Sequence, residues 1–507
     1  GQGGGINIQT AALNMALDEI ARADLLAEGI RLVGVSGSLI STSTILNNPN
    51  GTGILVQNSP GSTLNFGAAT IIDTGINSGN SGNAIDIATG NAGGSFTFSS
   101  LAVVTDRGIG ILANNSGTVN IGGVNNIIHS NQRAAVDVTN TNLGSGWTFS
   151  TLSSDNSTGN GAQLVSVTGN FTATAGAITN AAQTGFRISG GNNVVTYQGN
   201  ISTAVNRLID IQNRTGGSVT FQTGALSATG GTGVLAQNNT GGTITFGGLV
   251  SLNTGANGAV TLSANTGAAV TFSGGLSINT SSGYGLQASG GGTLTVSGTT
   301  NDLVTTTGVP LSVLNTTIGA GDLNFRRISA NGASQGIVLN NTGTAGGLKI
   351  GANLPGSSSV GDGGVLQNLT QNALSLTNTA NVSLNYARIQ TTGSHAVMGA
   401  GVTDQSGGTE PSLEIRQCAI LNAGNSDDEN ALHFVGNPGI SGRLAVSNTS
   451  ITSYFENALE VGNSSGTLQI DITSCTINDN NDTFGGDAIY VASQATAVVR
   501  LNLTNSS

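Results

Sequence analysis

The sequence has little charge, little proline, few aromatic residues and almost no cysteine. Only 8% of its 507 residues are charged, and 14 basic residues against 25 acidic ones give a formal net charge of −11. The only adjacent basic residues are Arg326 and Arg327. So little clustered positive charge does not match a phosphate backbone or an anionic lipid surface, and we expect no nucleic-acid partner.

Long apolar runs are missing as well. The apolar stretches are strand-sized and interrupted by Gly, Asn or Thr, whereas a membrane-spanning helix needs about 20 consecutive apolar residues. We therefore expect a protein that does not span a membrane. Its low charge and its many Asn, Thr and Ser residues favour an extracellular or cell-surface location. Because the chain starts with Gly1 rather than Met, we expect a processed product or a segment of a longer protein.

What the sequence does contain is a short repeat, restated about seventeen times from residue 51 onward. Its first limb alternates apolar and polar residues, as in Ile85-Asp86-Ile87 and Ile209-Asp210-Ile211. Such alternation is typical of a strand. Successive copies begin 23, 25, 26, 24 and 25 residues apart, at these positions: Phe186, Ile209, Val234, Val260, Tyr284 and Val309. A period of this size predicts a solenoid of stacked coils.

The second limb is the most uniform part of each repeat. Triplets such as Phe96-Thr97-Phe98, Val219-Thr220-Phe221 and Val270-Thr271-Phe272 place an outward Thr between two inward apolar residues. Trp147 falls in the inward column too. A shorter third limb closes each coil. Gly and Asn occupy the corners, where a sharp turn needs a positive φ, and stacked Asn amides should bond from rung to rung.

These limbs and corners make residues 51–507 resemble the right-handed parallel β-helix of bacterial surface proteins, such as autotransporter passengers and haemagglutinin-like adhesins. The resemblance implies an all-β fold: a single three-limbed solenoid of about 17 coils, with longer corner loops after about residue 342. Its handedness is that of the family and of parallel connections in general. The calcium-binding nonapeptide form of the fold is not matched.

Residues 1–50 are expected to form a separate cap or assembly segment that contains a short helix. Leu13, Ala16, Leu17 and Ile20 recur at helical spacing between Thr10 and Gly29. Such a helix would cover the first open rung, or would dock onto another subunit. The other end has no such segment, and the limb over 497–503 leaves a strand edge open to a further coil or to another protomer.

Few residues offer chemistry. Cys418 and Cys475 fall in one column with Thr449 between them, two rungs or about 9.6 Å apart, so we expect free thiols. His129, His395 and His433 lie in different coils and are not expected to converge. The outward acids Asp86, Asp137 and Asp210 belong to separate rungs. Hydrolysis needs acid and base groups within reach of one bond, so we expect no enzyme.

Metal binding has four weak candidates in the long corners of the last coils. Asp427, Asp428, Asp479 and Asp482 could present oxygen ligands to calcium, although they lack the spacing of a dedicated loop. A solvated corner is the alternative interpretation. No other cofactor is expected.

The sequence therefore favours a non-enzymatic, extracellular structural rod: a subunit or segment of a bacterial surface fibre that self-associates end to end. The alternative is an adhesin that binds a polysaccharide or a receptor through the loops 354–364, 403–411 and 424–430. A third hypothesis, a polysaccharide-degrading enzyme, is disfavoured because the acids lie on separate rungs. The outward Thr column could also engage an ordered surface, as in β-solenoid ice-binding proteins, but the neighbouring column is irregular.

Overall fold

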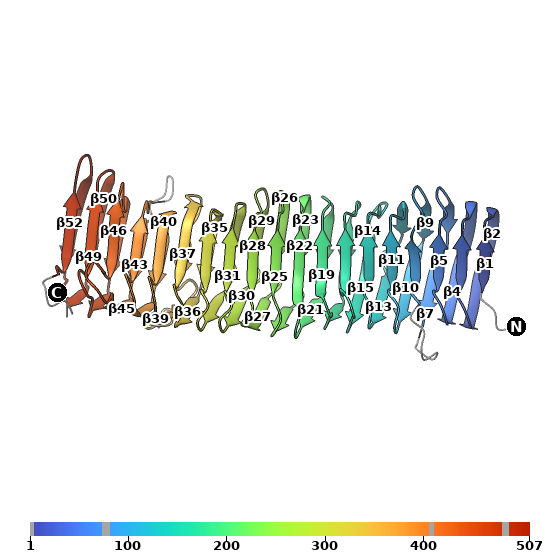
Figure 1. Cartoon of the computed structure of the whole chain (residues 1–507), viewed down its shortest axis with the longest axis horizontal. Coiled ribbons are helices and arrows are strands. Elements are labelled where there is room, and N and C mark those ends of the chain that lie inside the picture. Colours follow the sequence, from blue (N-terminus) through green and yellow to red (C-terminus); the bar gives the residue numbers. More distant parts are fainter. Residues whose placement is uncertain (1–4, 74–81, 405–409, 479–485) are drawn as a thin grey trace. The chain divides into compact units, whose positions relative to one another are not determined.

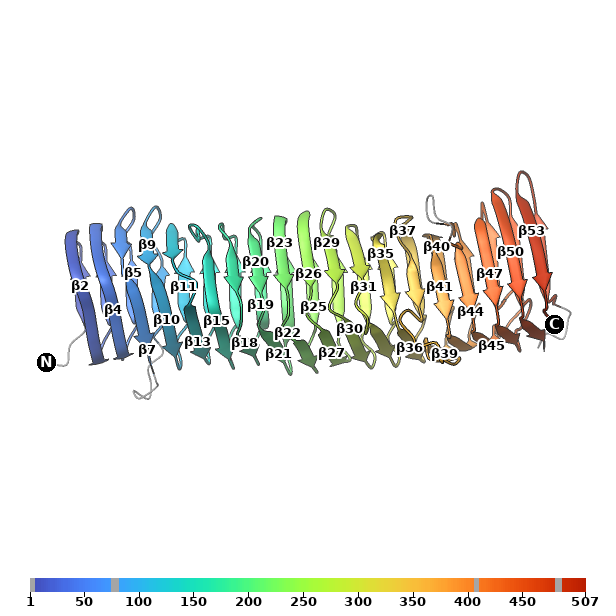
Figure 2. The ribbon, with the colours of Figure 1, turned by 180° about the vertical axis from the view of Figure 1, so that it is seen from behind.

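The computed structural model describes residues 5–73, 82–404, 410–478 and 486–507. The chain divides into two compact units, Gly1–Gly248 and Leu249–Ser507. Each unit is a parallel β-solenoid, and no helix occurs in the part of the chain that the structure describes. The expected all-β parallel solenoid is thereby confirmed. Figure 1 shows the strands of the first limb side by side within each unit, and Figure 2 shows the second limb from behind.

In the first unit, ten strands of the first limb form one parallel sheet. They are β1 (Ile6–Gln9), β3 (Ile30–Val33), β5 (Ile54–Gln57), β8 (Ile85–Ala88), β11 (Ile111–Asn114), β14 (Val136–Thr139), β16 (Ala162–Val165), β19 (Thr184–Ser189), β22 (Arg207–Gln212) and β25 (Val234–Gln237). The second limb contains β6 (Thr63–Asn65), β9 (Ser95–Phe98), β12 (Thr118–Ile121), β17 (Phe171–Ala173), β20 (Val194–Tyr197), β23 (Thr215–Phe221) and β26 (Gly241–Phe246). The third contains β7 (Ala68–Ile72), β10 (Ser100–Thr105), β13 (Asn126–Asn131), β18 (Ala177–Thr179), β21 (Asn200–Thr203) and β24 (Leu226–Thr229). Three long strands run through both the second and the third limb: β2 (Ala12–Leu25), β4 (Ser36–Pro49) and β15 (Trp147–Asp155).

The second unit has the same three limbs. Its first limb consists of β28 (Val260–Ser263), β31 (Leu286–Ser289), β34 (Leu311–Leu314), β37 (Ile337–Gly343), β40 (Leu374–Thr379), β43 (Val397–Ala400), β46 (Leu432–Gly436), β49 (Leu459–Asn463) and β52 (Ile489–Ser493). The second consists of β29 (Ala269–Phe272), β32 (Thr293–Val296), β35 (Thr317–Phe325), β38 (Leu348–Ile350), β41 (Val382–Asn385), β44 (Leu413–Arg416), β47 (Gly442–Ser447), β50 (Thr467–Thr473) and β53 (Val498–Thr504). The third consists of β27 (Val250–Gly255), β30 (Leu276–Thr280), β33 (Asp302–Thr305), β36 (Arg327–Asn331), β39 (Val365–Leu369), β42 (Arg388–Thr392), β45 (Ala419–Ala423), β48 (Ser450–Thr452) and β51 (Thr476–Asn478).

The core of each unit consists of apolar columns, because parallel register places equivalent residues of successive rungs over one another. Phe98, Phe221 and Phe272 are fully buried, as predicted, and Trp147 is buried with its indole N–H donating to the carbonyl of Val119 at 2.8 Å. Stacked rings follow the columns. The rings of Phe221 and Phe246 lie 5.7 Å apart at 6°, a separation at which offset aromatic pairs attract.

The corners use the expected asparagines. Asn115, Asn238 and Asn341 adopt positive φ between the first and second limbs. The Asn341 amide also bonds from rung to rung: Asn341 Nδ2 donates to Asn315 Oδ1 at 2.9 Å, and Asn378 Nδ2 donates to Asn341 Oδ1 at 2.8 Å. These side chains therefore both permit the turn and tie one turn to the next.

The helix expected between residues 10 and 29 is wrong. Residues 12–25 form β2, which pairs in parallel with β4 along nearly its whole length (Figure 2). Leu13 and Leu17 fit both periods, a helical face with Ala16 and an alternating strand with Met15, so the periodicity did not decide between the two structures. When residues 12–25 pair with the edge of β4, they help to bury Leu39 and Leu46 of that strand completely. This tertiary pairing favours the strand over the helix.

Two first-limb positions were also assigned wrongly. Val260 pairs with Leu286 and Leu286 pairs with Leu311, so Tyr284 and Val309 precede the column rather than lead it. Tyr284 is exposed. A shift of two residues leaves an alternating pattern unchanged, which is why the sequence did not reveal the error.

Truncating the aromatic column should destabilise the first unit. Phe221→Ala removes a buried ring stacked on Phe246, and we expect a loss of about 3–5 kcal/mol in the free energy of unfolding. Urea unfolding followed by circular dichroism measures the change. The control is Thr220→Ala on the same strand, whose side chain points outward and whose loss should cost less than about 1 kcal/mol. Equal effects of the two variants would contradict the assignment of inward and outward faces.

Candidate functional site

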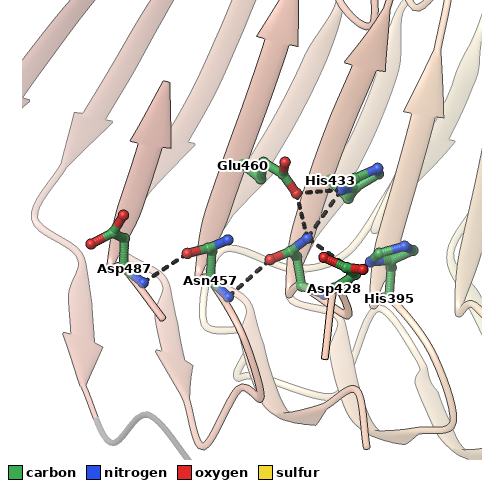
Figure 3. A network of polar contacts seen from close by, with 7 residues as sticks. His395, Asp428, His433, Asn457, Glu460 and Asp487 are labelled. Carbon is green, nitrogen blue, oxygen red and sulfur yellow. Dashed lines mark hydrogen bonds and ion pairs between the residues drawn. The ribbon is translucent and has the colours of Figure 1, made fainter. Parts of the chain in front are cut away.

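A polar network lies at the corners that precede the last first-limb strands (Figure 3). His395, Asn430, Asn457 and Asp487 each stand two residues before the strands β43, β46, β49 and β52. The side chains of the first three each accept the backbone N–H of the next member: Asn430 N–H donates to His395 Nδ1 at 2.9 Å, Asn457 N–H to Asn430 Oδ1 at 2.9 Å, and Asp487 N–H to Asn457 Oδ1 at 2.7 Å. These side chains thus accept hydrogen bonds from backbone N–H groups that have no partner in the pairing of the strands.

The same arrangement recurs far from this network. In the first unit, Asn83 Oδ1 accepts the N–H of Ile109 at 3.1 Å, and its amide donates to Asp86 Oδ2 at 3.0 Å. Asn160 repeats both bonds, with the N–H of Thr184 at 3.1 Å and with Gln163 at 2.7 Å. We call this arrangement the asparagine bracket: a corner side chain bonds forward to the next rung, and usually also to the outward residue three positions later. Its recurrence makes it an architectural feature.

The bracket has a sequence signal that the repeat analysis missed. Asn-Ala-Ile-Asp at 83–86 recurs as Asn-Ala-Leu-Ser at 372–375, Asn-Ala-Leu-His at 430–433 and Asn-Ala-Leu-Glu at 457–460. The copy at 372 is incomplete: its amide donates to Ser375, but its Oδ1 accepts no hydrogen bond from the next rung. The signal was missed because the first-limb triplets define the repeat, and the Asn lies before the alternating segment.

The expectation that the histidines do not converge is wrong for two of them. The rings of His395 and His433 stack with centroids 4.3 Å apart and planes 12° from parallel. They lie on neighbouring rungs, whose strands β43 and β46 pair directly, so the interstrand spacing brings the rings together. His129 does lie apart, half-exposed, with its Nε2 3.1 Å from Asp155.

The contacts of the two imidazoles involve the Nδ1 atom of each ring. His395 Nδ1 accepts an N–H and is therefore unprotonated. His433 Nδ1 lies 2.8 Å from Glu460 Oε2, which also accepts from the Asn430 amide at 2.7 Å. His433 Nδ1 also lies 3.0 Å from the Asn430 amide nitrogen, so it has both a donor and an acceptor within hydrogen-bond distance. Burial, with a further contribution from the charge of His433, lowers the pKa of His395 to about 4.

A pocket of about 290 Å³ lies beside this network and carries mostly polar groups. It is lined by Asp428, Glu456, Asn457, Glu460, Asp487 and Tyr490. Of the calcium candidates, Asp427 and Asp428 are exposed in the preceding corner, and only Asp428 reaches the pocket. Asp479 and Asp482 lie outside the described residues. Within the described ranges, no three His, Cys, Asp or Glu side chains are grouped so that they could hold a metal ion.

The corner carboxylate of Glu429 has a local role. Its Oε2 accepts the backbone N–H groups of Asn425 at 2.6 Å and Ser426 at 2.9 Å. It therefore fixes its own loop, as a short capping side chain does.

The first-limb acids do not form a pair among the described residues. Asp86 bonds Asn83, and Asp210 is buried and accepts from Gln212 at 2.7 Å, which corrects its expected exposure. Asp137 accepts from Gln163 at 2.8 Å, and burial raises its pKa. Each of the three carboxylates therefore accepts a hydrogen bond from a nearby side-chain amide.

Both cysteines are free and buried, as predicted. Thr449 lies between them: its hydroxyl accepts the N–H of Cys418 at 3.3 Å. Burial raises the pKa of the Cys418 thiol to about 12, so the reactive thiolate is suppressed.

One arginine is buried in a corner of the first unit. Arg214 is 2% exposed and donates to the carbonyl oxygens of Gly190 at 2.8 Å and Gly216 at 3.3 Å, to Asn193 Oδ1 at 2.7 Å, and to the Asn193 carbonyl. Burial lowers its pKa to about 10. The guanidinium thus serves as a multiple donor to main-chain carbonyls at the turn.

A second polar centre lies on the third limb of the second unit. Arg326 Nε donates to Oδ1 of Asp302, on β33, at 2.9 Å. The other carboxylate oxygen, Oδ2, contacts Arg326 Nη2 and forms an ion pair with Arg327 Nη2 at 3.2 Å. The two arginines line a pocket of about 420 Å³ together with residues of the loop 354–364. The only adjacent basic pair of the sequence is therefore part of a concave surface.

Comparison with protein-family models, with curated proteins and with solved structures yields no match. What the structure shows is the parallel β-solenoid, and function has to be argued from the sites. No helix among the described residues combines the length and the apolar character that crossing a membrane requires.

His395 should make the second unit sensitive to acid. Because its pKa is lowered from 6.5 to about 4 in the folded state, the unfolded chain binds a proton first as the pH falls. Its contribution to stability is complete above about pH 6.5 and is lost toward pH 4. His395→Asn keeps an acceptor for the Asn430 N–H, as in the other brackets, and removes the titrating group.

We therefore expect the difference in free energy of unfolding between wild type and His395→Asn to change progressively between pH 6.5 and pH 4, in favour of the variant at low pH. Urea unfolding at several pH values measures it. His129→Asn, at an exposed histidine in the first unit, should follow the wild-type curve. A His395→Asn curve parallel to wild type would contradict the assignment.

Proposed function

We propose that this chain is a non-enzymatic structural β-solenoid, a subunit or segment of an extracellular or cell-surface fibre that associates end to end. The parallel stack supports the proposal, because a rung that hydrogen-bonds a neighbour on one side presents the same donors and acceptors on the other. The low charge and the resemblance to bacterial surface β-helices support the location and the bacterial source.

The carrying observation concerns the strand β53. Its residues Leu501 and Leu503 pair with Ile470 and Ile472 of β50 and continue their inward columns. Ile470 and Ile472 are 0% and 2% exposed, whereas Leu501 and Leu503 are 42% and 52% exposed. The columns that form the dry core therefore continue to a face where apolar side chains meet solvent. A further rung would bury them, and either a continuing polypeptide or the strands β1 and β2 of a second copy would supply one.

The receiving face has one charged residue in an inward column. Arg22 of β2 pairs with the fully buried Leu46 of β4 and is exposed. Its aliphatic stem can lie along the column while its guanidinium reaches the surface. Stacking on this face is consequently weaker than it would be with leucine at position 22.

Negative-stain images of the purified chain over a concentration series test the proposal. We expect threads that lengthen with concentration in the wild type, short particles in Leu501→Glu/Leu503→Glu, and longer threads in Arg22→Leu. Thr504→Glu is the control, because its side chain points outward on the same strand and should leave the threads unchanged. Isolated particles at every concentration, or threads that survive the double Glu variant, would overturn end-to-end association.

The alternative, an adhesin that binds through the loops of the second unit, has one observation in its favour. Of the three expected loops, 354–364 lines the pocket with Arg326 and Arg327, whereas 424–430 contributes Asp428 to the smaller acidic pocket. In the loop 403–411, residues 405–409 lie outside the described ranges. The adhesin hypothesis therefore depends chiefly on the first of these loops.

A further inference from the structure

Two unusual features of the sequence meet at one place in the second unit. The basic pair Arg326-Arg327 and the long corner 354–364 together line the pocket of about 420 Å³. The corner contributes Leu354, Pro355, Ser358, Gly361 and Asp362, and the strands β36 and β39 contribute Ser329 and Val365.

The arginine pair is held in position and remains accessible. Asp302 is 10% exposed at its side chain and stands opposite Arg327 in the register of β33 and β36. It binds Arg326 through both of its oxygens. The side chains of Arg326 and Arg327 are nevertheless 40% and 47% exposed. One buried carboxylate thus fixes two guanidinium groups, whose remaining N–H donors stay available on the pocket side.

The facing loop is also held in place. The N–H groups of Gly361 and Gly363 donate to the carbonyl of Tyr386 at 2.6 and 3.1 Å. Ser358 Oγ donates to the carbonyl of Pro355 at 2.6 Å, and Asp362 Oδ2 accepts the N–H of Ser359 at 2.7 Å. The loop thus presents an apolar edge at Leu354 and Pro355, a hydroxyl at Ser358 and one carboxylate at Asp362.

We propose that this pocket binds the carboxylate of a uronic-acid unit in an acidic polysaccharide. A guanidinium fork matches a planar carboxylate. The apolar edge suits a sugar ring face, and Ser329 and Ser358 can bond its hydroxyls. Asp302 and Asp362 together balance the two guanidinium groups. A pocket without net charge, in a chain of net charge −11, suits one carboxylate on a sparsely charged polymer rather than a nucleic acid or a polyphosphate. Asp362 opposes the anion and limits its affinity.

Isothermal titration with trigalacturonate measures the binding, with a neutral galactose trisaccharide and inorganic sulfate as comparison ligands. We expect heat with trigalacturonate, none with the neutral sugar, and affinity that falls as salt is raised. Arg327→Gln should weaken binding about tenfold, because it removes a charge-assisted contact while leaving Arg326 on Asp302. Asp362→Asn should tighten it about threefold to tenfold, a gain that damage to the fold does not produce.

Arg107→Gln is the matched control. Arg107 has the same side-chain exposure of 47% and one acidic neighbour, Asp106, but lies in the first unit. It should bind like wild type. Binding that is absent in the wild type, unchanged in Arg327→Gln, or equal for the neutral sugar would overturn the proposal, and binding of sulfate alone would identify a general oxyanion site instead. None of these outcomes depends on thread formation, so this inference and end-to-end association fail separately.

Discussion

Main-chain hydrogen bonding between parallel rungs is the constraint on which the other features depend. It sets a spacing of about 4.8 Å, and at that spacing each side chain meets the residue at the same position one rung away. An inward position consequently becomes a column such as Phe221 on Phe246, and an outward one a ladder such as Asn341 on Asn315. Like charges in one column would repel along its whole length, which agrees with a content of only 8% charged residues. Where charges do occupy neighbouring rungs they alternate in sign, as with Asp302 and Arg327.

The sequence predicted the features that follow from the residue pattern within one rung or from the regular spacing of the rungs. Alternation within a limb identified the inward aromatics, and the need for a positive φ identified the corner asparagines. The thiols were predicted free from rung spacing alone. The helix proposed before residue 30 failed because Leu13 and Leu17 satisfy both periods, and because the edge of β4 contributes a bonding surface that no local pattern reveals. The two-residue shift at Tyr284 failed for a related reason: alternation fixes the face of a residue but not its register.

The candidate site depended on relations between rungs, which are harder to read. His395 and His433 are 38 positions apart because the intervening corner is long, yet they stack directly. Their rungs are neighbours despite the uneven step. Likewise, the basic pair and the loop 354–364 were both noticed in the sequence, but their meeting required the fold. The polar centres of the second unit thus occur where long corners interrupt the regular repeat, which is where a repetitive surface gains individual chemistry.

The asparagine bracket has a direction, since the corner side chains of Asn83, Asn160, Asn430 and Asn457 each accept a backbone N–H from the rung that follows. The backbone N–H that they accept is present in any residue except proline, so one coil can follow another without a matching side chain. Duplication or deletion of one coil in the gene would then preserve these bonds. Such interchangeability offers a route by which proteins of this kind change length over evolution without redesigning a single contact.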